Sequence, residues 1–131
     1  MGKLIGYARV STRAQDTDRQ EQDLLAAGVR RDDLYIDHGV SGGKAIRLGL
    51  TKALDALHDG DTLVITTLDR LGRSTQDMLK LAGDLKAAGV ALRVLNLGGG
   101  DVDTSTPTGQ MVLTIFAALA QMELEIKRER I

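Results

Sequence analysis

The sequence contains no cysteine and very few aromatic residues. Cysteine is absent from all 131 positions, so neither a disulfide nor a cysteine-ligated metal site can form, and the composition fits a cytosolic protein. Two tyrosines and one phenylalanine make up the whole aromatic content of 2%. We therefore expect an aliphatic core, and binding of single-stranded nucleic acid by stacking bases on aromatic rings is disfavoured.

The sequence also lacks the segments that direct a chain into a membrane. The N-terminus has no signal-peptide pattern, and no apolar run is long enough to span a bilayer. An excess of positive charge is missing as well, because 17 Lys and Arg residues face 18 Asp and Glu residues, for a net charge of −1. A domain that held nucleic acid by bulk electrostatics would normally be basic, so any such contact must depend on a local charge cluster or on another domain.

The chain does contain a regular alternation of strand and helix patterns, in a length that suits one domain with a real core. Strands are predicted at residues 4–9, 34–37, 62–67 and 90–95. Helices are predicted at 16–27, at 50–57, from Ser74 to just before Gly89, and from Thr106 onward. This order predicts an α/β fold, a three-layer domain with a mainly parallel sheet of four to five strands.

Glycines mark several of the predicted boundaries. Gly28, Gly60 and Gly89 each follow an apolar helical stripe and are expected to end the first three helices. The run from Gly98 to Gly100 follows the last predicted strand and is interpreted as a flexible hinge. These positions divide the chain into short units of strand and helix.

The last predicted helix has an unusual distribution of apolar residues. Thr106 is a candidate cap with Pro107 in the first helical position, and residues 111–122 are apolar almost all the way round. A surface helix of a monomer should show one apolar stripe, so we expect this helix to pack partly on another chain. Residues 1–105 are thus predicted to form the α/β domain and 106–131 the start of an interface helix. Its charged end has no glycine or proline stop, so we expect the natural protein to continue beyond Ile131.

Polar side chains gather where the predicted strands end. Arg9 and Ser11 follow the first strand, Arg47 the second, and Asp69, Arg70 and Arg73 the third. In open α/β sheets, ligands bind outside the carboxyl ends of the strands, so these side chains are expected at one edge. Each arginine alone has an ordinary surface explanation, and a serine commonly starts a turn or a helix. Convergence of all of them favours a functional site.

The predicted cluster suits phosphoryl transfer. Arginine presents a planar fork of donors that matches phosphate oxygens and stays charged at any working pH. Several arginines can stabilise the charge that a phosphodiester gathers under attack, without a metal. A serine hydroxyl can attack to give a covalent phosphoserine, which preserves the bond energy for resealing.

Two other classes of protein remain open from the residues alone. A metal-dependent nuclease or phosphatase would need a carboxylate cluster, and Asp69 has no obvious partner at the predicted site. A signalling receiver or interaction module of similar topology would want an acidic pair after the first strand, where this chain has Arg9 and Ser11. His38 and His58 lack metal-ligand spacing.

Several segments resemble sequence motifs of one known family, and they occur along the chain in the order expected for that family. The segments Tyr7-Ala8-Arg9-Val10-Ser11-Thr12 and Leu68-Asp69-Arg70-Leu71-Gly72-Arg73-Ser74 closely resemble two signatures of the serine site-specific recombinases, the resolvase and DNA-invertase group. Asp37, Ser41-Gly42 and Arg47-x-Gly49-Leu50 resemble the loop that carries a further active-site arginine. Thr106 to Gly109 and Phe116 to Glu123 resemble the family's long interface helix.

The resemblance implies a role for each candidate residue. Ser11 is the implied nucleophile, Arg9, Arg47, Arg70 and Arg73 the phosphate and transition-state ligands, and Gln20 and Asp69 supporting residues. The implied enzyme needs no cofactor or metal, forms a 5′-phosphoserine link on a double-stranded DNA recombination site, and frees a 3′-hydroxyl.

The resemblance also implies an assembly and a location. A homodimer would assemble to a tetramer that exchanges strands by subunit rotation and religates them, with no membrane involved. The implied location is the bacterial cytoplasm, at the nucleoid. The resemblance also allows that a mobile element encodes the protein. The family's C-terminal DNA-binding domain has no counterpart in this sequence.

Overall fold

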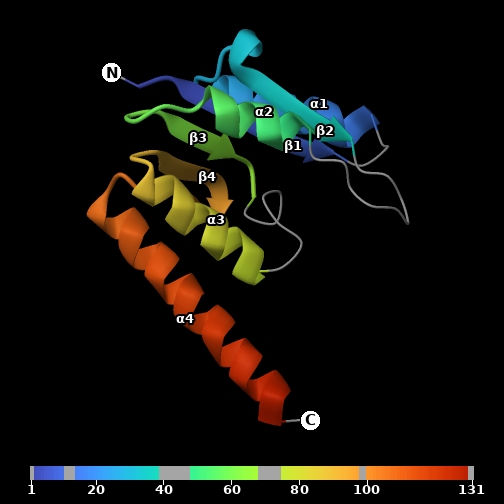
Figure 1. Cartoon of the computed structure of the whole chain (residues 1–131). Helices are drawn as coiled ribbons and strands as arrows, with labels where there is room; N and C mark the ends of the chain where they lie inside the picture. Colours follow the sequence, from blue (N-terminus) through green and yellow to red (C-terminus); the bar gives the residue numbers. More distant parts are fainter. Residues whose placement is uncertain (1, 11–13, 39–47, 68–74, 98–99, 130–131) are drawn as a thin grey trace.

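The computed structural model describes residues 2–10, 14–38, 48–67, 75–97 and 100–129 (Figure 1). Its elements in chain order are β1 (Leu4–Val10), α1 (Ala14–Ala26), a 3-10 turn (Arg31–Asp33), β2 (Leu34–His38), α2 (Leu48–Ala56), β3 (Thr62–Ile65), α3 (Thr75–Ala87), β4 (Ala91–Leu97), β5 (Gly100–Asp103) and α4 (Pro107–Glu129). The alternation of strands and helices matches the order predicted from the sequence.

The strands form one mixed sheet in the order β2-β1-β3-β4-β5. β1 pairs in parallel with β2 and β3, β3 pairs in parallel with β4, and only β5 is antiparallel to its neighbour. The prediction of a mainly parallel sheet is therefore confirmed. The prediction of a hinge through Gly100 is wrong for that residue, because Gly100 begins β5 and pairs with Leu97 of β4. Gly98 and Gly99 lie outside the described residues.

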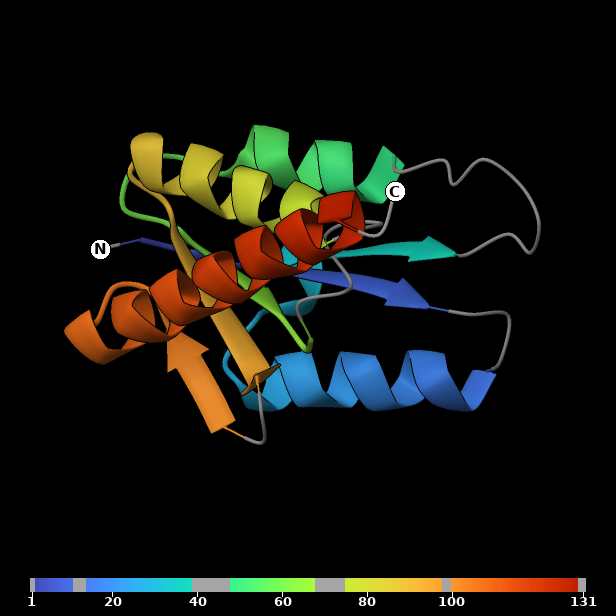
Figure 2. The same ribbon diagram turned by 90° about the horizontal axis from the view of Figure 1, so that it is seen from below.

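Helices cover both faces of the sheet, so the domain has three layers. Figure 2 shows α1 on one side of the sheet and α2 and α3 on the other. α4 crosses in front of the strands in this view, and its Leu113 packs against the same apolar cluster as α2 and α3. Two buried apolar clusters fill the space between the layers. The cluster on the α2 and α3 side contains Ile5, Tyr7, Leu50, Ala53, Leu63, Ile65, Ala82, Leu85, Val90, Leu92 and Val94. The cluster on the α1 side contains Ala8, Val10, Leu24, Val29 and Val64.

Successive residues of β1 divide between these two clusters, as strand periodicity requires. Ile5 and Tyr7 lie on the α2 and α3 side, whereas Ala8 and Val10 lie on the α1 side. Arg9 therefore belongs to the same face as Tyr7. Tyr7 is the only aromatic residue in either buried cluster of the described chain, so the core is otherwise aliphatic, as expected.

Two helix ends, those of α1 and α3, depend on the predicted glycines Gly28 and Gly89, which have positive φ angles of 108° and 78°, a conformation that favours glycine. The prediction that Gly60 ends the second helix is wrong, because α2 ends at Ala56 and Gly60, with a φ angle of 92°, lies in the turn before β3. At the end of α3 the amide of Val90 donates to the carbonyl of Leu85 at 2.8 Å, which closes the last turn.

The start of α4 is fixed by the predicted cap. The amide of Gly109 donates to Thr106 Oγ1 at 3.0 Å, and the Thr106 hydroxyl donates to the carbonyl of Asp103 at 2.7 Å. A side chain at Gly109 would collide with that carbonyl oxygen. Leu113, one turn further on, packs against the core cluster of the α2 and α3 side.

None of the helices in the described part of the chain is long and apolar enough to cross a membrane.

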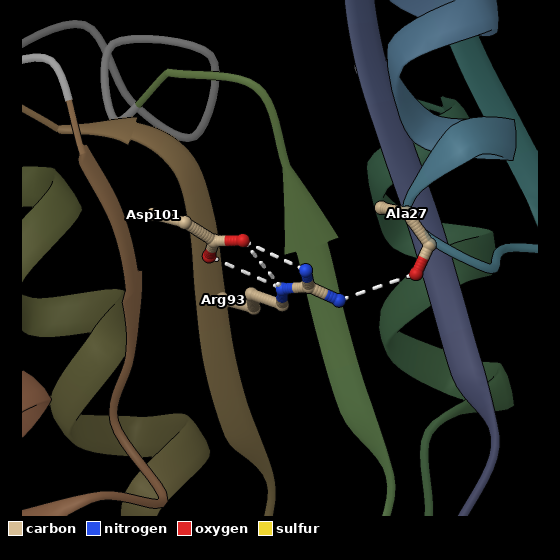
Figure 3. Close-up of polar contacts among 3 residues, drawn as sticks. All are labelled: Ala27, Arg93 and Asp101. Carbon is tan, nitrogen blue, oxygen red and sulfur yellow. Dashed lines mark hydrogen bonds and ion pairs between the residues drawn. The ribbon is translucent and has the colours of Figure 1, made fainter.

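An ion pair fastens the edge strand β5. Arg93 of β4 donates from Nε and Nη2 to the carboxylate of Asp101 on β5, with the shortest contact at 2.7 Å (Figure 3). Its Nη1 donates to the carbonyl of Ala27 at 3.2 Å, at the end of α1. Arg93 thus links β4 and β5 to the chain that leaves α1.

Candidate functional site

The described residues contain two of the predicted site residues, Arg9 and Gln20. Ser11, Arg47, Asp69, Arg70 and Arg73 lie outside the described residues. The described part of the site therefore consists of Arg9, Gln20 and the ends of the neighbouring strands and helices. Val10 and His38, the last residues of β1 and β2, are paired with each other in the sheet register. The carboxyl ends of β1 and β2 therefore lie side by side at one edge of the sheet.

Arg9 and Gln20 meet at the end of β1. Arg9 is partly buried, and Gln20 is 4% exposed on the sheet-facing side of α1, one turn before the fully buried Leu24. The side-chain amide of Gln20 donates to the carbonyl of Arg9 at 3.1 Å. Gln20 thus faces the sheet, and its hydrogen bond holds the backbone two residues before Ser11.

Sequence reasoning missed a second polar group at this edge, centred on Asp37. Asp37 is 8% exposed and lies opposite Arg9 in the register of β1 and β2. Its carboxylate accepts hydrogen bonds from the hydroxyl of the buried Tyr7 at 2.8 Å, and from the amides of Gly49 and Leu50 at 2.7 and 3.1 Å. Residues from β1, β2 and α2 thus meet at one carboxylate.

Gly49 permits this close approach. A Cβ at Gly49 would lie 2.7 Å from Oδ1 and 3.0 Å from Cγ of Asp37. The sequence signal for this group was a tyrosine in the mostly apolar first strand, because a buried tyrosine hydroxyl usually needs a partner. In the sequence, Asp37 and Gly49 belong to one motif, but a motif does not indicate which of its residues are in contact.

A pocket opens on the other face of the same edge. It has a volume of about 530 Å³ between α1 and the ends of β3 and β4. Its lining includes Gln20, Asp23, Thr66, Thr67 and Asn96. The carboxyl edge is therefore hollowed beside Gln20, where open α/β sheets bind their ligands. Residues 68–74, which carry the predicted Asp69, Arg70 and Arg73, follow directly after Thr67.

A separate surface feature runs along α4. Its exposed large apolar side chains are Met111, Ile115, Leu119, Met122 and Ile126, each between 42% and 58% exposed. Their spacing of four, four, three and four residues places them on one face of the helix, away from Leu113. A contiguous exposed apolar face of this kind marks an interaction surface.

The chain resembles proteins that are named as DNA recombinases. The serine recombinase gin of Escherichia phage Mu is 42% identical over 127 residues, which make up 97% of this chain and 63% of that protein. The DNA-invertase of Escherichia phage P1 is 44% identical over the same length, with 97% of this chain and 65% of the relative covered. The chain thus spans slightly less than two thirds of each of these relatives.

The fold and the domain agree with these sequence relationships. The N-terminal catalytic domain of TP901-1 integrase superimposes with a TM-score of 0.69 at 32% identity, over 95% of this chain and 98% of that domain. The model of the resolvase N-terminal domain matches residues 4–131. On these grounds the chain belongs to the resolvase family of serine recombinases, whose N-terminal domain it contains.

Proposed function

We propose that this chain is the catalytic domain of a serine site-specific recombinase that cleaves and rejoins double-stranded DNA. The observation that carries the proposal is the end of β1. The strand delivers Arg9, with its backbone held by Gln20, two residues before a serine in the family's nucleophile motif. Membership of the resolvase family supports the same reaction class. A receiver module or a metal-dependent nuclease has no comparable support.

In the proposed reaction the Ser11 Oγ attacks the scissile phosphorus. The bond from phosphorus to the 3′ oxygen breaks as the bond from phosphorus to Oγ forms. The proton of Ser11 ends on the 3′ oxygen, so the products are a 5′-phosphoserine and a free 3′-hydroxyl. Attack by a 3′-hydroxyl reverses these steps and releases the enzyme, and no external energy source is needed because the phosphodiester energy is retained.

The arginines of the proposed site stabilise charge. Arg9, Arg47, Arg70 and Arg73 would donate to the non-bridging phosphate oxygens, where negative charge develops in the transition state. Gln20 would fix the end of β1, and Asp69 would orient an arginine or take part in proton transfer. With this many fixed positive charges, the proposed reaction needs neither metal nor cofactor.

The exposed apolar face of α4 is the proposed subunit interface. Burying its five large side chains against a second copy would remove apolar surface from water at roughly 25 cal/mol per Å². We propose a homodimer formed through this face, and a tetramer of two dimers on two DNA sites. Exchange of strands by rotation of one half of the tetramer would then precede resealing.

The experiment uses a chimera, because a recombination site for this chain is not defined by its sequence. Residues 1–131 are joined to the remaining C-terminal part of the phage P1 DNA-invertase and mixed with DNA that this invertase recombines. We expect a protein–DNA adduct on a denaturing gel. Ser11→Ala should abolish the adduct and leave DNA binding intact. An adduct of equal yield in the Ser11→Ala chimera contradicts the proposed nucleophile.

A further inference from the structure

Two of the five large apolar side chains on the exposed face of α4 are methionines. Met111 is 58% exposed and Met122 is 50% exposed. They lie 11 residues apart in one helix, which is about three turns and about 16 Å along its axis, so both belong to the same face. The face therefore carries one thioether near the start of α4 and a second one near its charged end.

We infer that Met111 and Met122 are oxidative modification sites, and that their conversion to methionine sulfoxide prevents self-association through α4. The inference rests on the proposed function, because it concerns the subunit interface proposed there. The oxidant is a hydroperoxide such as hydrogen peroxide. A lone pair of the methionine Sδ attacks a peroxide oxygen, an S–O bond forms and the O–O bond breaks. The sulfur is oxidised by two electrons, and the peroxide is reduced to water.

The composition of the chain leaves methionine as the side chain that can respond to an oxidant in this way. Cysteine, which is the other side chain with a reversible oxidation chemistry, is absent. Of the four methionines, Met1 lies outside the described residues and Met78 lies in α3. Met111 and Met122 are the ones that the described part of the chain exposes on the apolar face of α4. A hydroperoxide can thus reach both from solvent in the dissociated chain.

The neighbours of these methionines would make a sulfoxide unfavourable in the assembled interface. Ile115, Leu119 and Ile126 share the face, and their side chains offer no hydrogen-bond donor. A thioether packs well among such side chains, whereas a sulfoxide oxygen is a polar acceptor that would leave water without a partner. A two-fold dimer uses the same surface on both subunits, so each modified position would enter the interface twice.

Oxidation and association would exclude each other. A dimer formed through this face would cover both methionines, so the hydroperoxide reacts with the dissociated chain. The sulfoxide then disfavours reassociation, and the population moves toward monomer as the oxidised fraction grows. Methionine sulfoxide reductases, which act on one sulfoxide epimer each, would restore the thioether and with it the interface. Assembly thus becomes dependent on the level of hydroperoxide.

The modification is tested on the chain without DNA, by sedimentation velocity before and after treatment with hydrogen peroxide. Peptide mass spectrometry measures the sulfoxide at each methionine. Once Met111 and Met122 are oxidised, we expect the dissociation constant for self-association to rise at least about tenfold, because polar oxygens are buried without partners. Treatment with the reductases for both epimers should reverse the change. An oxidised chain that associates as tightly as the untreated chain overturns the inference.

Variants separate these two methionines from the rest of the chain. The double variant Met111→Leu with Met122→Leu keeps the face apolar at similar volume, so it should self-associate and should not respond to peroxide. Met78→Leu is the matched control and should respond as wild type does. Met111→Gln with Met122→Gln puts a polar amide at both positions and should be more monomeric without any peroxide. A response of the double leucine variant as large as that of wild type would assign the effect to another residue and overturn the inference.

The rate of oxidation gives a second readout. At Met111 and Met122 it should fall as the protein concentration rises through the range in which the chain associates. Rates that do not change with concentration in that range would show that association leaves both sulfur atoms open, which contradicts the inference. The far-UV circular dichroism of the oxidised chain should match that of the untreated chain. A loss of helical signal in step with monomer formation would mean that oxidation unfolds the chain, and this also overturns the inference.

The outcomes separate this inference from the proposed function. In the P1 invertase chimera, prior oxidation should slow formation of the Ser11-dependent adduct in wild type and leave the double leucine variant unaffected. If the wild-type chimera cleaves and Leu119→Glu dissociates the untreated chain, but oxidation changes neither assembly nor rate, the role of the methionines is wrong and the proposed function stands. If the untreated chain does not associate through α4, the proposed interface fails, and the role of Met111 and Met122 fails with it.

Discussion

Arg93 and Asp101 form a bidentate ion pair across β4 and β5, with Nη2 of Arg93 2.7 Å from Oδ2 of Asp101. The hydrogen bonds with Asp101 raise the pKa of the Arg93 guanidinium above its ordinary value. The pair tethers the antiparallel edge strand whose end leads directly into α4. A residue pair outside the predicted site residues thus tethers the strand that leads to the proposed subunit interface.

Removing this ion pair should cost modest stability. The side chains of Arg93 and Asp101 are 27% and 45% exposed, so solvent screens their attraction. We expect Asp101→Asn to lower the free energy of unfolding by roughly 0.2–1 kcal/mol. Arg93→Gln should cost somewhat more, because it also removes the hydrogen bond to the Ala27 carbonyl. Urea unfolding of both single variants and the double variant measures the coupling. Strictly additive effects would mean that the pair contributes nothing.

Asp61 should make stability depend on pH at the acid end. Hydrogen bonds from the amides of Lys3 and, next, His58 lower the pKa of its carboxyl below 3.8. A lowered pKa in the folded state means that the stabilisation is fully present above the unfolded pKa of about 4. It is lost as the pH falls through the folded value.

The test of Asp61 compares Asp61→Asn with wild type in urea at several pH values. We expect a loss of about 1–3 kcal/mol at pH 7, since a buried hydrogen-bonding group is left poorly satisfied. The difference should shrink as the pH falls below about 4. Asp55→Asn, an exposed site on α2, serves as the control and should have little effect. A difference that is independent of pH would contradict the assigned cause.

Single arginines of the proposed cluster should act on the rate of cleavage. Removing one preorganised donor to the transition state should slow adduct formation by about 10²–10³-fold for Arg9→Ala, Arg47→Ala, Arg70→Ala and Arg73→Ala. Arg30→Ala, exposed in the turn at the other end of the sheet, is the control and should cleave normally. Single-turnover measurement of adduct formation in the chimera gives these rates. Wild-type rates at two or more of the four positions would refute the cluster.

Charge on the apolar face of α4 should weaken self-association. Leu119→Glu places a carboxylate among side chains that the proposed interface buries, and Ala118→Glu does so one residue earlier. Gln121→Glu adds the same charge at an exposed polar position of the helix and is the control. Sedimentation velocity at matched concentrations should show more monomer for the first two variants alone. The same oligomer distribution for all three would remove α4 as the interface.

The sequence predicted the parts of this fold that are determined locally. Helix ends at Gly28 and Gly89 depend on a backbone conformation that glycine favours, and the α4 cap needs only Thr106 and its near neighbours. The inward position of Gln20 agrees with its helical spacing of four residues from the buried Leu24. Local rules suffice for such features because both partners lie within one or two turns.

Contacts between distant residues were not predicted. Gly100 was expected in a flexible hinge because it belongs to a run of three glycines, but it pairs with Leu97 of β4 and begins β5. Asp37 and Tyr7 are 30 residues apart, and nothing in their spacing indicates that their side chains meet. For the candidate site, the sequence predicts a set of residues and a common edge, and of that set the described residues contain Arg9 and Gln20. Only the structure supplied the carboxylate that joins β1 to α2.

The central claim, that the protein cuts DNA with a serine and without a metal, has one direct test. The P1 invertase chimera and its DNA are stripped of metal, mixed in excess EDTA, and quenched in denaturant. The DNA is labelled at its 5′ end in one experiment and at its 3′ end in another, so that both ends of the cleaved strand can be identified. The motivating feature is the predicted set of four arginines with one carboxylate, whereas a magnesium site usually takes one or two carboxylates plus substrate phosphates. We predict product whose 5′ end is blocked by protein and whose 3′ end is a free hydroxyl. Loss of cleavage in EDTA, restored by magnesium and yielding free 5′-phosphates, would contradict the account.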